Sequence, residues 1–350
     1  MAKFRETFST IAIAVGLVLA VGIFLLAVGE WMARRVATPA STTSLESPQE
    51  RYPELPRLRG LHDLTQPNQR GVFAGNLFET NRSGLRGPFR RKAKPNGVTR
   101  VVLAGDSFAM ASGVLYENAY AARLEALYRE GGHRVQVINV GLAGLNADAI
   151  VTRFIDAGLP YEPDVGIYGF TLDDILGDDY IHSADARFTN ANPMAGSRSH
   201  LVRLLGPRIW SLYELLASPV GSYSHELDEN LLDNLRVTDA LAADFVRLRE
   251  AIESRGGCGV VFIHPHLWAL HGLHPHVRHY QAVQEIAEAS GLTAIPSHPY
   301  FTSGLVGRAP DYWIDRSDPH PNAAGHAILA RALFDGLQQL PARCGLEASS

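Results

Sequence analysis

The chain has 350 residues, of which 46% are hydrophobic and 19% are charged, a balance that predicts a globular protein with one sizeable core. A net charge of -4 gives no sign of the basic face that phosphate backbones require, so nucleic acid is not expected as a partner. The two cysteines, Cys258 and Cys344, lack the spacing of a zinc site or a redox dithiol. A disulfide and two free thiols both stay open at this point.

The N-terminus carries a long apolar run. Every residue from Ile11 to Val28 is apolar or glycine, with Lys3 and Arg5 before the run and Arg34 and Arg35 after it. The run is about long enough to cross a ~30 Å hydrocarbon core, which predicts an uncleaved membrane anchor over residues 1–35. A cleaved signal peptide and a buried helix are the alternatives. Positive charge at both ends does not fix the orientation, and a catalytic domain outside the cytoplasm is inferred from the short N-terminal tail.

Residues 36–98 are polar and interrupted by prolines, which disfavours regular helix and predicts a linker followed by a lead-in segment. The second half contains Asn76–Phe78 and Asn81–Gly87, whose apolar and glycine content predicts packing on the domain.

From residue 99 to 340 apolar strands alternate with helical spacing. This alternation predicts a three-layer α/β/α sandwich with a mainly parallel, flavodoxin-like sheet, since right-handed crossovers place helices on both faces. Ligands of such sheets bind at the carboxyl ends of the strands. The predicted strands are Val101–Ala104, Val135–Val140, Asp164–Phe170, Val260–Ile263 and Leu292–Ile295, and the predicted helices are Ala121–Tyr128, Ala147–Ala157, Thr238–Ser254, Val277–Ala289 and Ala323–Leu337.

A stretch of mixed polar composition, about 173–236, interrupts this order. We interpret it as an insertion that includes a helix over Leu201–Leu216, and both a lid and simple decoration fit it. Residues 341–350 form a C-terminal tail.

Ser107 follows the first predicted strand, within Gly105–Phe108. A serine on such a turn is exposed at the carboxyl edge of the sheet, near backbone amides. It needs a base to act as a nucleophile, and a plain helix cap is the alternative role.

His320 lies between two prolines, just before the last predicted helix. A fixed loop of this kind can aim an imidazole, and Asp318 is close enough to orient it. An acid, a histidine and a distant serine are the parts of a catalytic triad, whereas the segment taken alone is also typical of a surface turn.

Three segments in this order resemble the SGNH/GDSL hydrolase family: Gly105–Phe108, Asn139–Gly144 and Asp318–Asn322. The similarity spans roughly Thr99 to Leu337. It implies that Ser107 is the nucleophile, that His320 is general base and then acid, and that Asp318 orients His320. It also implies an oxyanion hole formed by the amides of Ser107 and Gly144.

The chain departs from the family pattern at two places. The family's third block ends in an asparagine that donates to the oxyanion, whereas Asp173 stands at the matching place, and an ionised carboxylate cannot donate. Either Asp173 is protonated, or Asn146 substitutes, or catalysis is impaired, because losing one donor costs about 10²–10³ in rate. The family acid often lies three residues before the histidine, where this chain has Ser317, so Asp315 is the reserve for Asp318.

Six histidines crowd the segment from His264 to His279. No carboxylate or cysteine completes a ligand set at a recognised spacing, so no metal site is predicted. The glycines at Gly141 and Gly144 do not complete a dinucleotide fingerprint, and no cofactor is expected.

The sequence thus predicts a serine hydrolase, an esterase or deacylase that cleaves an acyl ester on an envelope carbohydrate or lipid through an acyl-enzyme. An acyltransferase that uses the same residues to acylate a glycan is one alternative. A catalytically weak glycan-binding or assembly protein is another, and Asp173 is the feature in its favour.

Overall fold

A computed structural model of the chain describes residues 21–35, 52–175, 199, 201–202, 205, 235–267, 276–302, 309–314, 318 and 320–346. Residues 1–20 of the predicted anchor, most of the predicted insertion and nearly all of the helix predicted over Leu201–Leu216 lie outside these ranges. Residues 21–35 are helical. In the part of the chain that is described, no helix has both the length and the apolar character needed to span a bilayer.

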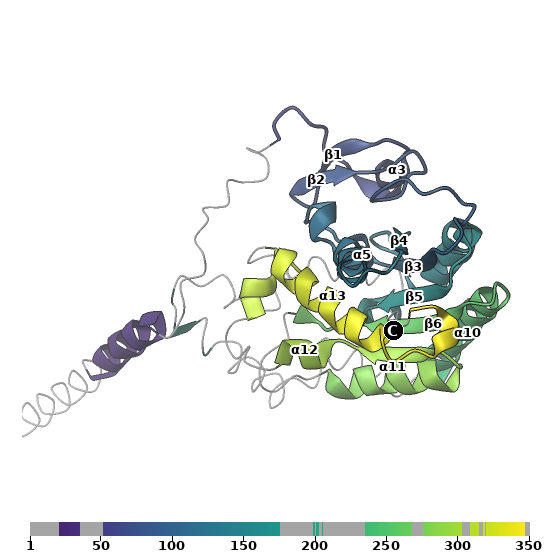
Figure 1. Ribbon diagram of the computed structural model, residues 1–350. Helices are drawn as coiled ribbons and strands as arrows, with labels where there is room; N and C mark the ends of the chain where they lie inside the picture. Colours follow the sequence, from purple (N-terminus) through teal and green to yellow (C-terminus); the bar gives the residue numbers. More distant parts are fainter. Residues whose placement is uncertain are drawn as a thin grey trace, which may run out of the picture.

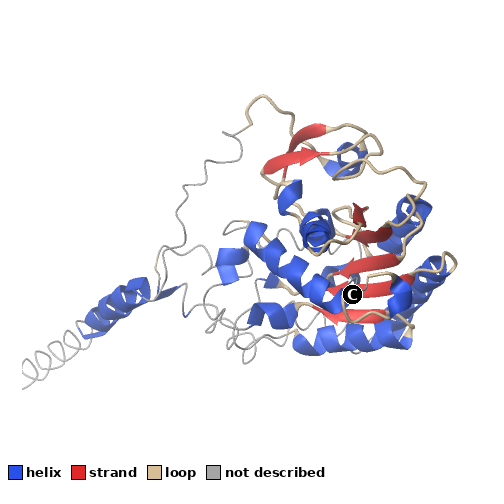
Figure 2. Ribbon diagram, in the orientation of Figure 1, coloured by secondary structure: helices blue, strands red, loops and turns tan. Residues whose placement is uncertain are grey.

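Five parallel strands form the central sheet (Figures 1 and 2). Their spatial order is β4-β3-β5-β6-β7, which is the 2-1-3-4-5 order of a flavodoxin-like sheet and confirms the predicted fold class. All four neighbouring pairs are in parallel register. The strands are β3 (Thr99–Gly105), β4 (Val135–Asn139), β5 (Val165–Phe170), β6 (Cys258–Ile263) and β7 (Thr293–Pro296).

Helices cover both faces of the sheet because side chains of each strand point alternately to the two sides (Figure 1). Val101 and Leu103 of β3 share a core with α5 (Tyr120–Glu130) and α13 (Ala323–Leu337). Val102 and Ala104 share the opposite core with α6, α10 and α11. The bounds of these last helices are Ala147–Arg153, Leu235–Glu253 and Val277–Ala289.

The predicted helix Ala147–Ala157 is divided in the structure. After α6 the chain continues as a π-helical turn, Phe154–Gly158. Gly158 lies close to the sheet, where an added Cβ would be 2.8 Å from a Val102 methyl, so the turn brings the backbone against β3.

The lead-in segment packs against the sandwich through a β-hairpin. Helix α3 (Gly60–Thr65) precedes strands β1 (Arg70–Phe73) and β2 (Asn76–Glu79), which pair antiparallel. Phe78 of this hairpin shares an apolar cluster with Met110, at the end of the short helix after β3, and with Leu142, in the loop after β4.

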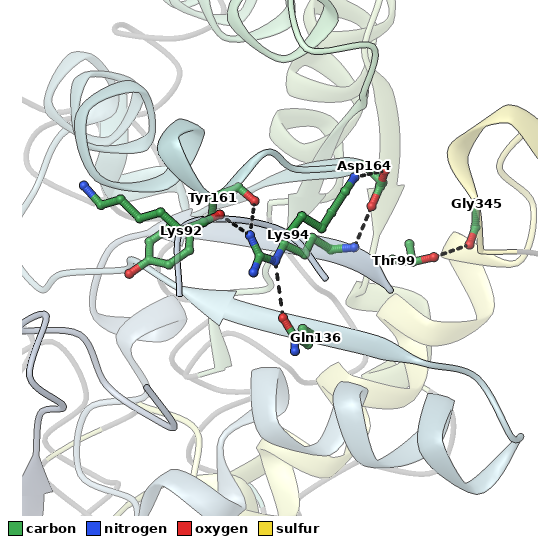
Figure 3. Close-up of polar contacts among 8 residues, drawn as sticks. Lys92, Lys94, Thr99, Gln136, Tyr161, Asp164 and Gly345 are labelled. Carbon is green, nitrogen blue, oxygen red and sulfur yellow. Dashed lines mark hydrogen bonds and ion pairs between the residues drawn. The ribbon is translucent and has the colours of Figure 1, made fainter. Parts of the chain in front are cut away.

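Cys258 and Cys344 form a disulfide, which decides between the alternatives that the sequence left open. Their Cα atoms are 5.7 Å apart, and the bridge joins the start of β6 to the short helix η8 (Ala342–Cys344). The hydroxyl of Thr99 donates to the Gly345 carbonyl at 2.8 Å beside it (Figure 3). The C-terminal tail is therefore fastened to the amino edge of the sheet.

Candidate active site

Ser107 opens the short helix that follows the first strand of the sheet. Strand β3 ends at Gly105, where φ is 154° and an added Cβ would lie 2.5 Å from the Gly169 carbonyl oxygen, so only glycine fits. Helix α4, Ser107–Met110, starts directly afterwards, and its cap is Asp106, which accepts from the Phe108 amide at 2.9 Å. Because Asp106 caps the helix, the Ser107 hydroxyl is not used for capping.

Ser107, His320 and Asp318 lie in one hydrogen-bonded row. The Nε2 atom of His320 is 2.8 Å from the Ser107 Oγ, although the two residues are 213 positions apart. The Nδ1 atom of His320 is 2.6 Å from an Asp318 carboxylate oxygen, which also accepts from the His320 amide at 3.0 Å. A neutral imidazole that donates from Nδ1 to Asp318 presents a lone pair at Nε2, where the serine hydroxyl donates its proton. The reserve acid Asp315 lies outside the described residues.

The carboxylate of Asp318 favours the charged imidazole. Burial opposes a charge on His320, but the hydrogen bond and the charge of Asp318 outweigh it and hold the pKa of His320 above its usual value. Burial likewise opposes a charge on Asp318, and the hydrogen bonds from His320 outweigh it, so the pKa of Asp318 is lowered. The pair is thus set to stabilise an imidazolium next to Ser107.

Asn322 fixes the loop that carries His320. Its side-chain oxygen caps α13 by accepting from the Ala324 and Gly325 amides at 2.9 and 3.1 Å. Its amide nitrogen donates to the Trp313 carbonyl at 2.9 Å. The His320 carbonyl in turn accepts from the Ile314 amide at 2.9 Å, so the imidazole is carried on a loop held at both ends.

The loop after β4 reaches the same edge. Asn139 is buried there, donates to the Ala109 carbonyl at 2.6 Å and accepts from the Gly141 amide at 2.8 Å, which joins the glycine segment to α4. Gly144 has φ of 78° and open space where a side chain would start. Asn146, the suggested substitute donor, caps α6 by accepting from the Ala149 amide at 3.1 Å.

Asp173 lies in η4 (Leu172–Ile175), the turn that follows β5. Its negative charge acts on two residues of the site, because it helps to raise the pKa of both Asp106 and His320. One carboxylate oxygen is 3.8 Å from Nε2 of His266, whose pKa burial lowers to about 3, so that histidine is neutral at physiological pH.

Two buried carboxylates that the sequence reasoning did not single out lie beneath Ser107. Asp106 and Asp174 are 7% and 2% exposed. The Thr171 hydroxyl oxygen lies between them, 3.0 Å from Asp106 and 3.1 Å from Asp174. Burial, aided by the charge of Asp173, raises the pKa of Asp106 to about 6, and burial, aided by the charge of Asp106, raises the pKa of Asp174 well above its usual value.

Arg86 of the lead-in segment supports helix α4, and the sequence reasoning did not single it out either. Its buried guanidinium donates to the carbonyls of Met110 and Ala111 at 2.7 and 2.6 Å and to that of Val114 at 2.6 Å. These are the carbonyls at the end of α4 and of the loop after it. Burial lowers the pKa of Arg86 to about 10, which leaves the side chain charged at neutral pH.

The histidines near the site are buried rather than arranged as a ligand set. Burial lowers the pKa of His264 to about 3, and its ring packs 5.4 Å from that of Phe108 between centroids. His276 and His279 are fully buried, and His271 and His274 lie outside the described residues. Within the described ranges, no three histidine, cysteine or acidic side chains are grouped so as to hold a metal ion.

No family model and no curated protein matches the chain. Solved structures do. An acetylxylan esterase from Geobacillus stearothermophilus is similar at 16% identity over 74% of this chain and all of that one, with a TM-score of 0.45. TesA is similar at 11% identity over 69% of this chain and 98% of that one, with a TM-score of 0.41. A putative lipolytic protein of the G-D-S-L family from Desulfitobacterium hafniense is similar at 13% identity over 68% and 99% of the two chains, with a TM-score of 0.39.

Proposed function

We propose that the chain is a serine hydrolase that cleaves an acyl ester through an acyl-enzyme on Ser107. The observation that carries this proposal is the continuous row of hydrogen bonds from the Ser107 hydroxyl through His320 to Asp318. A serine hydroxyl is a weak nucleophile unless an adjacent base removes its proton, and the row supplies that base with its orienting acid. A structural cap has no need of it, since Asp106 already caps α4.

The reaction follows from this geometry. The Ser107 Oγ forms a bond to the ester carbonyl carbon while its proton passes to Nε2 of His320, and Asp318 stabilises the imidazolium. Collapse of the tetrahedral intermediate breaks the carbon–oxygen bond to the alcohol, which takes the proton from Nε2. Water then attacks the acyl-enzyme with His320 again as base, which releases the acid and restores the serine.

The Ser107 and Gly144 amides are the proposed donors to the negative oxygen of the intermediate. The amide of Ser107 is in the first turn of α4, where backbone N–H groups lack helical partners and favour an anion. In the family pattern a third donor stands at the position of Asp173, and we propose that as a carboxylate this residue slows the reaction.

The proposal is tested by hydrolysis of a generic activated acetyl ester by the purified full chain. Ser107→Ala should abolish hydrolysis above the rate without enzyme, because no acyl-enzyme can form. Ser112→Ala is a matched control, since Ser112 is a buried serine in the turn after α4, five positions from Ser107, and its side chain is not part of the proposed triad. If Ser107→Ala retained the rate of the unmodified chain, the proposal would be wrong.

We further propose that the substrate is an acylated envelope carbohydrate or lipid and that the domain is held at a membrane outside the cytoplasm. The disulfide supports an oxidising compartment. The helix over residues 21–35 supports the anchor, because Ile23, Phe24 and Leu26 are each more than 60% exposed to the surroundings. Protease treatment of intact cells should digest the domain, and persistence of the intact domain until the membrane is opened would contradict this placement.

A further inference from the structure

The two buried carboxyl groups beneath Ser107 raise the question of how many protons they hold in the folded protein. Asp106 and Asp174 are withdrawn from water, and the Thr171 hydroxyl lies within hydrogen-bond distance of both. A hydroxyl has one proton to donate, so it can satisfy only one of two ionised carboxylates. With both ionised, its second contact would set a lone pair against a charged oxygen in a region that screens charge poorly.

One proton on the pair removes this conflict. If either acid is protonated, it donates to the Thr171 oxygen, and the threonine donates onward to the other acid. Every polar atom of the row then has a partner, and one negative charge is buried in place of two.

The contacts decide which acid holds the proton. Asp106 accepts from the Phe108 amide at 2.9 Å and is also 3.4 Å from the Ser107 hydroxyl, and it lies close enough to His320 to favour the imidazolium. Asp174 accepts from the Thr171 amide at 3.0 Å, and a hydrogen bond from the Tyr168 hydroxyl also favours its ionised form, but both donors are neutral and no cation is among the groups that shift its titration. The negative charge is better stabilised on Asp106.

We infer that Asp174 is a neutral carboxylic acid that donates to Thr171, which donates to Asp106, so that a single negative charge lies beneath Ser107 and His320. Thr171 and Asp174 are then positioning residues, since they reach the nucleophile only through Asp106. The part of this inference that concerns catalysis rests on the proposed hydrolase function, whereas the proton on Asp174 does not.

The direction of the titrations agrees with one proton held by the pair, because burial raises the pKa of both Asp174 and Asp106. The charges of Asp173 from η4 and His320 from the loop before α13 reach Asp106. The charges of Asp106 and Asp174 in turn raise the pKa of the neutral tyrosines beside them, Tyr120 from α5 and Tyr168 from β5.

Proton linkage tests the inference without an activity assay. Above pH 5 the folded chain holds a proton on Asp174 that the unfolded chain releases, so raising the pH destabilises the wild-type protein relative to Asp174→Asn. The asparagine keeps both contacts, because its amide nitrogen can donate to Thr171 and its oxygen can accept from the Thr171 amide. The unfolding equilibrium constant of the wild type, divided by that of the variant, should rise about tenfold for each pH unit between pH 5 and 7.

Asp156→Asn is the matched control, because Asp156 is exposed and its variant should show no such slope. A ratio that does not change with pH for Asp174→Asn would overturn the inference. A tenfold slope found in Asp106→Asn in place of Asp174→Asn would also overturn it, because the proton would then belong to Asp106.

Kinetics test the positioning role. Thr171→Val removes the hydroxyl at nearly constant volume, so Asp106 loses a hydrogen-bond donor. We expect kcat/KM to fall about 10-fold with little change in KM. The midpoint of the pH profile of kcat/KM should also move. Thr171→Ser should restore both the rate and the midpoint. An unchanged rate and profile in Thr171→Val would contradict the role in catalysis. Absence of activity in the wild type would instead count against the proposed function and leave the linkage test intact.

Discussion

Both edges of the sheet contain buried charged groups, but the partners of these groups differ between the two edges. At the amino edge the Arg100 guanidinium, 1% exposed, donates to the carbonyls of Lys92 and Tyr161 at 2.5 and 2.7 Å and to the Gln136 side chain at 3.3 Å (Figure 3). It also donates to the carbonyls of Arg91 and Ala93, at 2.7 and 3.1 Å. All these acceptors are neutral and fixed, and no proton has to move.

At the carboxyl edge Arg86 likewise donates to carbonyls, but the acids and the histidine around Ser107 exchange protons or share them. Ser107 and His320 are joined by one hydrogen bond whose proton is transferred in the proposed reaction, and Asp106 and Asp174 hold a number of protons that depends on pH. The comparison indicates that a buried charge surrounded by neutral acceptors stabilises the fold, whereas ionisable groups paired with one another provide chemistry. Removing Arg100 at the amino edge should therefore lower stability, whereas removing Ser107 or His320 at the carboxyl edge should lower activity.

The largest expected effect is on activity at the carboxyl edge. His320→Ala should lower kcat/KM for an activated ester by about 10³–10⁴-fold or more, because the serine loses its base. The melting temperature should change little, since the His320 side chain is 29% exposed and is not part of the core. A variant that loses its fold together with its activity would break the distinction between the edges.

Replacing Arg100 should give the opposite result. Arg100→Met leaves several buried carbonyls without a donor and should cost about 3–4 kcal/mol in the free energy of unfolding, measured with urea. The kcat of the folded fraction should be unchanged. Arg129→Met, at an exposed site on α5, is the control and should lie within about 0.5 kcal/mol of the wild type. Loss of kcat in folded Arg100→Met would show that the amino edge also serves the chemistry.

The disulfide is the second stabilising device at the amino edge. Its loop spans 86 positions, so the double variant Cys258→Ser/Cys344→Ser should lose about 2–4 kcal/mol of stability. A reductant should lower the melting temperature of the wild type and not that of the variant. Equal melting temperatures for oxidised and reduced wild-type protein would refute this contribution.

Asp173→Asn should raise activity. An amide in place of the carboxylate can donate to the oxyanion and removes a negative charge near it, so kcat should increase about 10-fold with KM nearly constant. Asp239→Asn, at an exposed site on α10, is the control. A decrease in kcat would mean that the carboxylate itself takes part, in contact with substrate or with His266.

The pH profile gives the smallest effect. Because the pKa of His320 is raised, kcat/KM should increase with pH through a midpoint above the usual histidine value of about 6.5, as the imidazole loses its proton and becomes the base. Asp318→Asn should move that midpoint to lower pH, since the imidazolium loses its partner. For stability the sign is reversed: the contribution of the His320 charge is present below about pH 6.5 and is lost as the pH rises through the raised pKa. An identical midpoint in Asp318→Asn would show that Asp318 does not control the base.

The alternation of short apolar runs with helical spacing of apolar residues made the sheet predictable. Each strand of the sandwich is a short apolar run between helical patterns, and the predicted strand bounds differ from the structure by one or two residues at most ends. The hairpin Arg70–Glu79 was missed because its turn is Ala74–Gly75, both at positive φ, and alanine is an unusual residue there. The break after Arg153 was missed because a π-helical turn leaves the apolar spacing almost unchanged.

The residues of the proposed triad were predictable because Ser107 begins the helix after the first strand, and Asp318 and His320 lie in the loop just before α13. The groups that support them were not. Arg86 and Arg100 are long charged residues, which are usually exposed, and only the tertiary structure surrounds them with carbonyls. Thr171 and Asp174 are typical loop residues, and their importance depends on Asp106, which is 65 residues away from Thr171 in the sequence. The disulfide joins cysteines whose spacing has no recognisable pattern.

The nucleophilic character of Ser107 is tested most directly by a fluorophosphonate probe, which reacts with activated serines, followed by mass spectrometry of the labelled full chain. The triad geometry predicts a single adduct, on the peptide that contains Ser107, and its loss in His320→Ala. A folded wild-type chain that takes up no probe, or that carries it on another serine, would contradict the assignment of Ser107 as the nucleophile.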